Sequence, residues 1–191
     1  MITEGFFPTL IHAEDVQLDN KLFEQEIIEW SKKDKGVKKT NVKGWHSQTN
    51  MFNIPVFKPL VDELFKMQHQ IYEEERLDRQ PKLGNMWANI NYSGGYNKPH
   101  IHPNSLFSGV YYIKAPKNCG RIRLWDPRGV LQHSMTDNRY FNDGHEYNYI
   151  NVEEGMIIYF PSWLEHDVEP SKSNEDRISV AFNLYKIRGA T

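Results

Sequence analysis

The stretch Asp176-Arg177-Ile178-Ser179-Val180-Ala181-Phe182-Asn183 has the pattern of a β-strand with two unlike faces. Side chains alternate between the faces of a strand, so Arg177, Ser179 and Ala181 share one face. The other face carries three large apolar residues: Ile178, Val180 and Phe182. A buried arginine needs an anionic partner, because an unpaired buried charge is costly and the guanidinium fork fits a carboxylate. The stretch therefore predicts a sheet strand whose inner face binds a carboxylate.

Segments on the N-terminal side of this strand have the same two-residue period. From Gly84 onward, four apolar residues alternate with Trp87, Asn89 and Asn91. These four are Met86, Ala88, Ile90 and Tyr92. Further strands are predicted at 45–52, 108–114, 121–126, 146–152, 156–160, 165–169 and 177–187, with turn residues between them. Seven to nine short strands at this spacing favour a jelly roll.

Two apolar stripes at helical spacing precede the strands. One runs from Leu18 to Trp30 and ends near Gly36, and the other runs from Pro59 to Asp78. We therefore expect a mainly β protein with N-terminal helices packed on one sheet of a double-stranded β-helix. A single domain would span 1–191, with a helical part at 1–83 and the catalytic core at 84–191.

The composition narrows the classes of function. The formal net charge is −2 and the basic residues form no long run, so nucleic-acid binding is not predicted. Cys119 is the only cysteine, which excludes an internal disulfide and indicates a reducing compartment. The N-terminus lacks the pattern of a signal peptide, and no apolar run could span a membrane. We expect a cytoplasmic protein, in the host cytoplasm if the source is a virus.

Three histidines are candidate metal ligands. His100 and His102 are two residues apart, so both point to one side if the segment is extended, and His166 follows 64 residues later (166 − 102). A His-x-His pair alone is as well explained by a surface strand end. The strand that contains Arg177 favours a ligand-binding site over this plain reading. Ser179 could donate to the same carboxylate as Arg177, so a metal and an anionic ligand could share one pocket. The alternative partner of Arg177 is a neighbouring acid: Glu165, Asp167 or Glu169.

The order of these motifs closely resembles a family of 2-oxoglutarate/iron(II)-dependent oxygenases related to prolyl 4-hydroxylases. That family occurs in marine bacteria and their viruses. The resemblance runs from about Trp87 to Asn183. It is carried by His-x-His at 100–102, Ser-Gly-Val-Tyr-Tyr at 108–112, Phe-Pro-Ser-Trp-Leu-x-His at 160–166, and Arg-x-Ser-x-x-Phe-Asn at 177–183. It implies a double-stranded β-helix that uses iron(II), 2-oxoglutarate and O₂, with ascorbate as a supporting reductant.

The resemblance also implies roles for individual residues. His166 matches the distal metal histidine, Arg177 the residue that grips the far carboxylate of 2-oxoglutarate, and Ser179 its assistant. Tyr92 is similar in placement to a family tyrosine before the first metal motif, which makes it a candidate co-substrate ligand. Tyr112 resembles a tyrosine that often lies on the co-substrate. A plain core aromatic explains either tyrosine equally well.

One departure from the wider superfamily concerns the metal ligands. The usual facial triad is His-x-Asp/Glu…His, whereas here His102 occupies the carboxylate position. The three histidines could form the face themselves. A carboxylate such as Asp126 or Asp167 could instead complete a site with one of the proximal pair. The site could also have lost its oxygenase role.

The activity that the resemblance implies is oxidative decarboxylation of 2-oxoglutarate coupled to oxidation of a C–H bond. The substrate could be a peptidyl proline, another protein side chain or a small molecule. A long polar loop at 128–145 is expected at the pocket mouth, where Arg139, Tyr140 and His145 could touch substrate. The rivals are a non-catalytic jelly-roll binding module and a cupin-type metalloenzyme that does not use 2-oxoglutarate. The glutamate of the cupin motif is missing, since Leu106 and Phe107 stand in its place.

Overall fold

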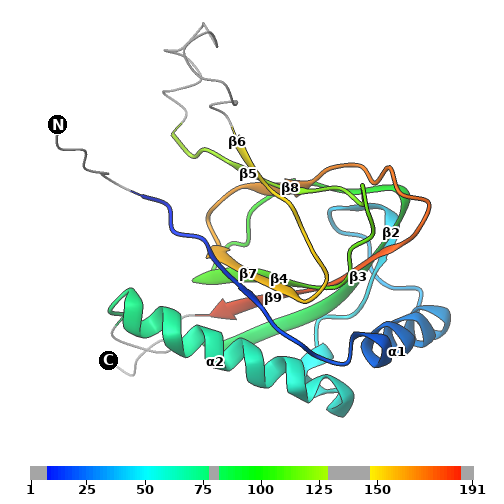
Figure 1. Cartoon of the computed structure of the whole chain (residues 1–191), viewed down its shortest axis with the longest axis horizontal. Helices are drawn as coiled ribbons and strands as arrows, with labels where there is room; N and C mark the ends of the chain where they lie inside the picture. Colours follow the sequence, from blue (N-terminus) through cyan, green and yellow to red (C-terminus); the bar gives the residue numbers. More distant parts are fainter. Residues whose placement is uncertain (1–7, 78–81, 129–146, 186–191) are drawn as a thin grey trace, which may run out of the picture.

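A computed structural model describes residues 8–77, 82–128 and 147–185 (Figure 1). Two α-helices, α1 (Asn20–Lys33) and α2 (Lys58–Glu74), are accompanied by two single 3₁₀ turns, Met51–Asn53 and Pro55–Phe57. The strands are β1 (His12–Asp15), β2 (Asn41–His46), β3 (Lys82–His100), β4 (Phe107–Lys114), β5 (Ile122–Trp125), β6 (Tyr147–Ile150), β7 (Met156–Pro161), β8 (His166–Val168) and β9 (Arg177–Tyr185).

The strands form one antiparallel sheet that curls into a roll. Their order is β1-β7-β4-β9-β3-β8-β5-β6, and β2 pairs separately with β3. β3 is the strand that joins the two layers. Its first part, from Lys82 to Asn91, pairs with β9, whereas Asn97 and His100 pair with β8. In Figure 1, β7, β4, β9 and β3 form one layer and β5, β6 and β8 the facing one. The predicted jelly roll is confirmed.

Both helices cover the outer face of the β7-β4-β9-β3 layer, as Figure 1 shows for α2. Buried residues of α1 and α2 form one core with the outer face of β9. These residues are Phe23, Ile27, Leu60, Leu64, Met67, Ile71, Ile178, Val180, Phe182 and Leu184. The Tyr159 hydroxyl of β7 donates to the Leu64 carbonyl at 2.6 Å, so α2 is also held by a buried hydrogen bond. The prediction of helices on one sheet is confirmed.

The ends of the first helix follow from local chemistry. The Asp19 side chain accepts from the Leu22 backbone N–H at 3.1 Å and caps the helix N-terminus. Lys32 and Lys33 occupy the last turn, where the helix dipole favours positive charge. The second helix contains Pro59 in its first turn, as predicted.

Several predicted bounds differ from the structure, most clearly those of β2 and α2, and one short strand was not predicted. β2 begins at Asn41 and ends at His46, four residues before the predicted strand 45–52 begins and six before it ends, and residues 51–53 form a 3₁₀ turn. β1 was not predicted, because its four residues carry little apolar signal and it forms only by pairing with β7. The helix predicted to reach Asp78 ends at Glu74.

The inner faces of the two layers enclose the interior of the roll. A small apolar cluster fills part of it, formed by Tyr112, Ile122, Leu124, Ile158, Phe160 and Leu164. The remaining interior is a cavity. None of the helices in the described part of the chain is long and apolar enough to cross a membrane.

Candidate metal centre

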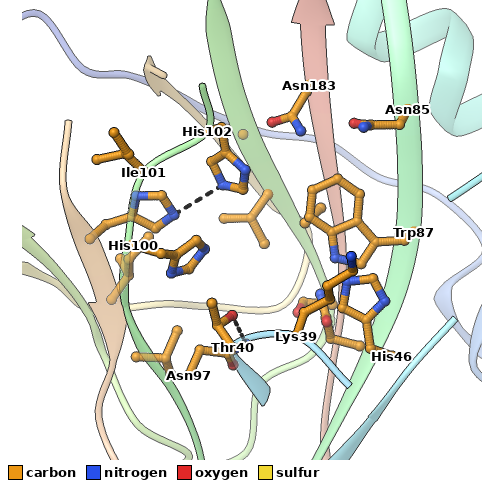
Figure 2. A pocket seen from close by; sticks show the side chains of 18 of the residues that line it. Lys39, Thr40, His46, Asn85, Trp87, Asn97, His100, Ile101, His102 and Asn183 are labelled. Atoms are coloured by element: carbon orange, nitrogen blue, oxygen red, sulfur yellow. Dashed lines mark hydrogen bonds between the residues drawn. The ribbon is translucent and has the colours of Figure 1, made fainter. Parts of the chain in front are cut away.

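A cavity of about 450 Å³ lies between the two layers. The inner faces of β3, β4 and β9 line one wall, and the end of β3 and the start of β8 line the other. Six predicted site residues line this cavity: His100, His102, His166, Arg177, Ser179 and Tyr112. Figure 2 shows His100 and His102 on one side of the cavity and Trp87 and His46 on the other.

The three histidines converge because β3 and β8 are paired. His100 and His166 are opposite each other in the antiparallel register, and His102 lies two residues beyond. One ring nitrogen of each histidine lies within 4.8 Å of the others. The Nε2 atoms of His102 and His166 are 3.3 Å apart. Two nitrogens that are each about 2.1 Å from one ion would be separated by about 3.0 to 3.4 Å, so this pair already has ligand spacing.

Backbone carbonyls decide which nitrogen of two rings carries the proton. His166 Nδ1 lies 2.9 Å from the Leu164 carbonyl, and His100 Nδ1 lies 2.7 Å from the Lys98 carbonyl. A carbonyl can only accept, so each Nδ1 donates and each Nε2 keeps a free lone pair. Second partners of this kind orient metal-binding histidines in proteins generally. The donor set therefore fits a divalent transition metal.

Burial keeps the three rings in their neutral form. It lowers the pKa of His102 to about 4, with a smaller contribution from His100. Burial also lowers the pKa of His166, and again His100 adds to the effect. The pKa of His100 is likewise lowered by burial. Neutral imidazole is the form that binds metal, so protonation does not compete at neutral pH.

The two carboxylates considered as replacement ligands are engaged elsewhere. Asp167 accepts from Arg123 Nη2 at 2.7 Å and from Trp125 Nε1 at 2.9 Å. Asp126 accepts from Arg128 Nη2 at 2.6 Å. Among the residues that the structure describes, the metal cluster contains histidines alone. Alternation along β8 explains this for Asp167, which points away from His166.

Arg177 is 2% exposed and lacks an acidic partner within the described ranges. Its Nη2 donates to Asn91 Oδ1 at 3.0 Å, while its Nε has no hydrogen-bond partner. Glu169 is bound by Arg121 at 2.8 Å, and Asp167 by Arg123. The alternative in which one of the neighbouring acids neutralises Arg177 is therefore not found. A buried guanidinium with an unused donor is suited to an incoming carboxylate.

Two further predicted residues lie beside Arg177. Tyr112 and Ser179 are opposite each other in the β4–β9 pairing, and both line the cavity. The Arg177 guanidinium carbon is 5.8 Å from the centre of the Tyr112 ring. Burial raises the pKa of Tyr112 to about 12, so its hydroxyl stays protonated and can donate. Arg177, Ser179 and Tyr112 thus present donors at one end of the cavity.

Tyr92 does not join them. Its side chain is 43% exposed, and it is not among the described residues that line the cavity. The two-residue period explains this placement, since Tyr92 follows Asn91 and points to the opposite face. The predicted mouth residues Arg139, Tyr140 and His145 lie outside the described residues.

Three residues that the sequence analysis did not single out belong to the site. Trp87 faces the cavity with its ring centre 5.9 Å from that of His102. His46 stacks on Trp87 at 5.3 Å with an interplanar angle of 9°. Asn91 accepts a hydrogen bond from Arg177 Nη2 through its side-chain oxygen. The available signal was the alternation of Trp87, Asn89 and Asn91 with buried apolar residues. His46 carried no signal, because its place depends on the pairing of β2 with β3.

Comparison with known proteins identifies the family of this site. A family described as "Putative 2OG-Fe(II) oxygenase" matches residues 85–183, just over half of the chain. A search of curated proteins finds no match.

Solved structures with the same fold are numerous. A Pseudomonas putida prolyl-4-hydroxylase matches with a TM-score of 0.63 and 14% identity, over 95% of this chain and 94% of the other. The viral collagen prolyl hydroxylase of Paramecium Bursaria Chlorella virus-1, solved with 2-oxoglutarate, matches with a TM-score of 0.58 and 15% identity, over 91% of this chain and 94% of the other. HygX from Streptomyces hygroscopicus, solved with nickel and 2-oxoglutarate, matches with a TM-score of 0.62 and 11% identity, over 93% of this chain and 83% of the other. At these identities the likeness concerns the fold.

Proposed function

Since the chain belongs to this family of 2-oxoglutarate/iron(II)-dependent oxygenases, we propose that it is a hydroxylase whose iron is bound by His100, His102 and His166. The observation that carries the proposal is the convergence of three neutral imidazoles beside a buried arginine without an acidic partner in the described structure. The rival cupin-type enzyme and the non-catalytic module are not favoured, because neither explains a family match that includes both features.

The remaining site residues hold the co-substrate. Arg177 forms charge-assisted hydrogen bonds with the far carboxylate of 2-oxoglutarate, and Ser179 and Tyr112 donate to the same group. The bound iron, co-substrate and O₂ together supply decarboxylation to succinate and oxidation of a C–H bond, with ascorbate keeping the metal reduced. The chain contributes orientation and a shaped cavity.

The substrate that we propose is a proline-containing peptide. Two similar structures are prolyl hydroxylases, and the Trp87 indole, which lines the cavity beside His102, offers a surface for a pyrrolidine ring. A cavity of about 450 Å³ is large enough for 2-oxoglutarate and one side chain. We also propose that 1–191 forms one domain, because the helices and the roll share a core. The cytoplasmic location stays a prediction based on the single cysteine.

Succinate release tests the proposed function. With iron(II), ascorbate, 2-oxoglutarate and proline-containing peptides, we expect succinate and hydroxylated peptide in equal amounts, measured by mass spectrometry. His69→Ala, on the outer face of α2, serves as the control that keeps activity. Succinate without peptide oxidation would contradict the peptide substrate alone, whereas no succinate at all would contradict the proposed hydroxylase.

Asn91 is a positioning residue in this proposal. Asn91→Ala removes the oxygen that accepts from Arg177 Nη2, so the guanidinium keeps only its longer hydrogen bond, 3.5 Å from Nη1 to the Gly120 carbonyl. A hydrogen bond to a charged group contributes roughly 1.5 to 3 kcal/mol. We therefore expect KM for 2-oxoglutarate to rise at least about tenfold, with kcat little changed in initial-rate measurements. A fall in kcat at unchanged KM would place Asn91 in another role.

A further inference from the structure

A chain of side-chain hydrogen bonds runs from the buried arginine to the rim of the cavity. Arg177 Nη2 donates to Asn91 Oδ1 at 3.0 Å, and Asn91 Nδ2 donates to Asn97 Oδ1 at 3.1 Å. Asn97 Nδ2 then donates to Thr40 Oγ1 at 3.3 Å, the bond drawn as a dashed line in Figure 2. Four residues are linked in this way: Arg177 of β9, Asn91 and Asn97 of β3, and Thr40 of the segment before β2.

The direction of this chain is set at its buried end. A guanidinium has only donors, so Asn91 must turn its oxygen toward Arg177 and its NH₂ toward Asn97. The same reasoning then orients Asn97, whose NH₂ faces Thr40. The Thr40 hydroxyl therefore accepts within the chain, and its own hydrogen is left to donate. Thr40 lines the cavity, so this donor is available to a molecule that enters it.

Lys39 stands next to this donor. Its side chain is exposed, lines the cavity and makes no ion pair with an acid in the described ranges. In Figure 2, Lys39 and Thr40 lie between the histidine side and the Trp87 side of the cavity. His46 lines the same cavity; burial lowers its pKa, and the Lys39 ammonium lowers that pKa further.

The backbone around these two donors is fixed. The Lys98 N–H donates to the Thr40 carbonyl at 3.0 Å, which ties the segment to β3. The Lys39 N–H donates to Asn41 Oδ1 at 2.8 Å. Because the backbone is held on both residues, binding a ligand there orders little more than the lysine side chain.

The charge of the site favours an anion at this rim. The described residues that line the cavity include two cations, Lys39 and Arg177, and no carboxylate. If the proposed function holds, iron(II) and Arg177 bring three positive charges and 2-oxoglutarate brings two negative ones. The usual triad would supply the missing negative charge through its carboxylate, but His102 does not. One positive charge thus remains in a cavity of low dielectric, before Lys39 is counted.

We propose that the substrate carries a carboxylate near its reacting carbon, and that Lys39 Nζ and the Thr40 hydroxyl bind it. This inference rests on the proposed oxygenase activity and three-histidine site, but not on the peptide substrate, and it adds the charge of the substrate. The carboxylate belongs either to a small acid or to an acidic residue of a peptide. Its binding at the rim leaves the neighbouring C–H bonds to reach toward the histidines, past the Trp87 ring.

The test uses probes that differ only in charge. Full-length protein loaded with Mn(II) and 2-oxoglutarate binds each probe without turnover, and paramagnetic broadening of the probe's NMR signals reports affinity and proximity to the metal. The small-acid pairs are N-acetylalanine with N-acetylalaninamide and N-acetylproline with N-acetylprolinamide. The peptide pair is acetyl-Pro-Glu-amide with acetyl-Pro-Gln-amide. Because 2-oxoglutarate fills the Arg177 end, the probes report on the remaining cavity.

We expect the acidic member to bind about tenfold more tightly, as for a charge-assisted contact near a positive centre. The preference should vanish in Lys39→Gln and persist in Lys39→Arg. The neighbouring exposed Lys38, which does not line the cavity, supplies the matched control Lys38→Gln and should behave as the unchanged protein. A preference in the first two pairs indicates a small acid, and one in the third pair alone indicates an acidic peptide.

Equal broadening within all three pairs, including none in any of them, would overturn the inference, as would a preference that survives Lys39→Gln. Failure of the proposed function has a different signature, since the protein would then bind no Mn(II) or would release no succinate with any substrate.

Discussion

Replacing His166 with alanine is expected to lower the affinity for iron(II) at least about 100-fold. Removing a residue that only hydrogen-bonds to a metal ligand already lowers metal affinity by about 10- to 100-fold, and His166 is proposed to be a ligand itself. His166 is the buried member of the triad, and its Nε2 lies 3.3 Å from that of His102. Bound metal would be measured by anaerobic calorimetry, with circular dichroism to verify folding. His69→Ala on α2 is the matched control. Full iron binding by folded His166→Ala would contradict the three-histidine site.

His102 distinguishes this site from the usual triad, and two variants test it. His102→Leu removes a ligand and should weaken iron binding as His166→Ala does. His102→Asp restores the His-x-Asp pattern and should keep the metal, because Asp is a standard ligand at that position. If His102→Leu binds iron normally, His102 is not a ligand.

Replacing Arg177 with methionine is expected to weaken 2-oxoglutarate binding by about 100- to 10,000-fold, since two charge-assisted hydrogen bonds contribute roughly 1.5 to 3 kcal/mol each. The same variant should unfold at the same or a higher temperature when 2-oxoglutarate is absent. The reason is that Arg177 is buried with an unpartnered Nε and no acidic partner in the described structure, so its charge costs free energy in the empty protein.

Calorimetry on the metal-loaded protein and a thermal melt without 2-oxoglutarate measure the two effects separately. Arg121→Met is the control, because Arg121 pairs with Glu169 on the surface and lies away from the cavity. A large loss of stability in Arg177→Met at unchanged 2-oxoglutarate affinity would mean that the arginine is structural.

The strand faces could be predicted because they depend on local alternation. Residues 177–183 point inward and outward as expected, with Arg177 and Ser179 in the cavity and Ile178 and Val180 in the core under the helices. The same rule accounts for Tyr92, whose neighbour Asn91 points toward Arg177. The resemblance assigned Tyr92 to the co-substrate, but the period of its own strand placed it on the other face.

The partners of these residues could not be predicted, because pairing between distant strands depends on the packing of the whole roll. β1 exists only because β7 offers an edge to it. His46 and Thr40 reach the cavity through the pairing of β2 with β3 and the contacts of the segment before it.

The sequence by itself determined which residues face inward, the order of the metal and arginine motifs, and the presence of two outer helices. These features repeat with the period of a strand or a helix, and a period is a property of neighbours along the chain. Only the tertiary structure decided that Asp167 turns to Arg123, that His100 meets His166, and that Arg177 keeps a free donor. Each of these depends on which strands lie side by side. β3 pairs with β9 in one layer and with β8 in the other, and so it brings the two motifs together.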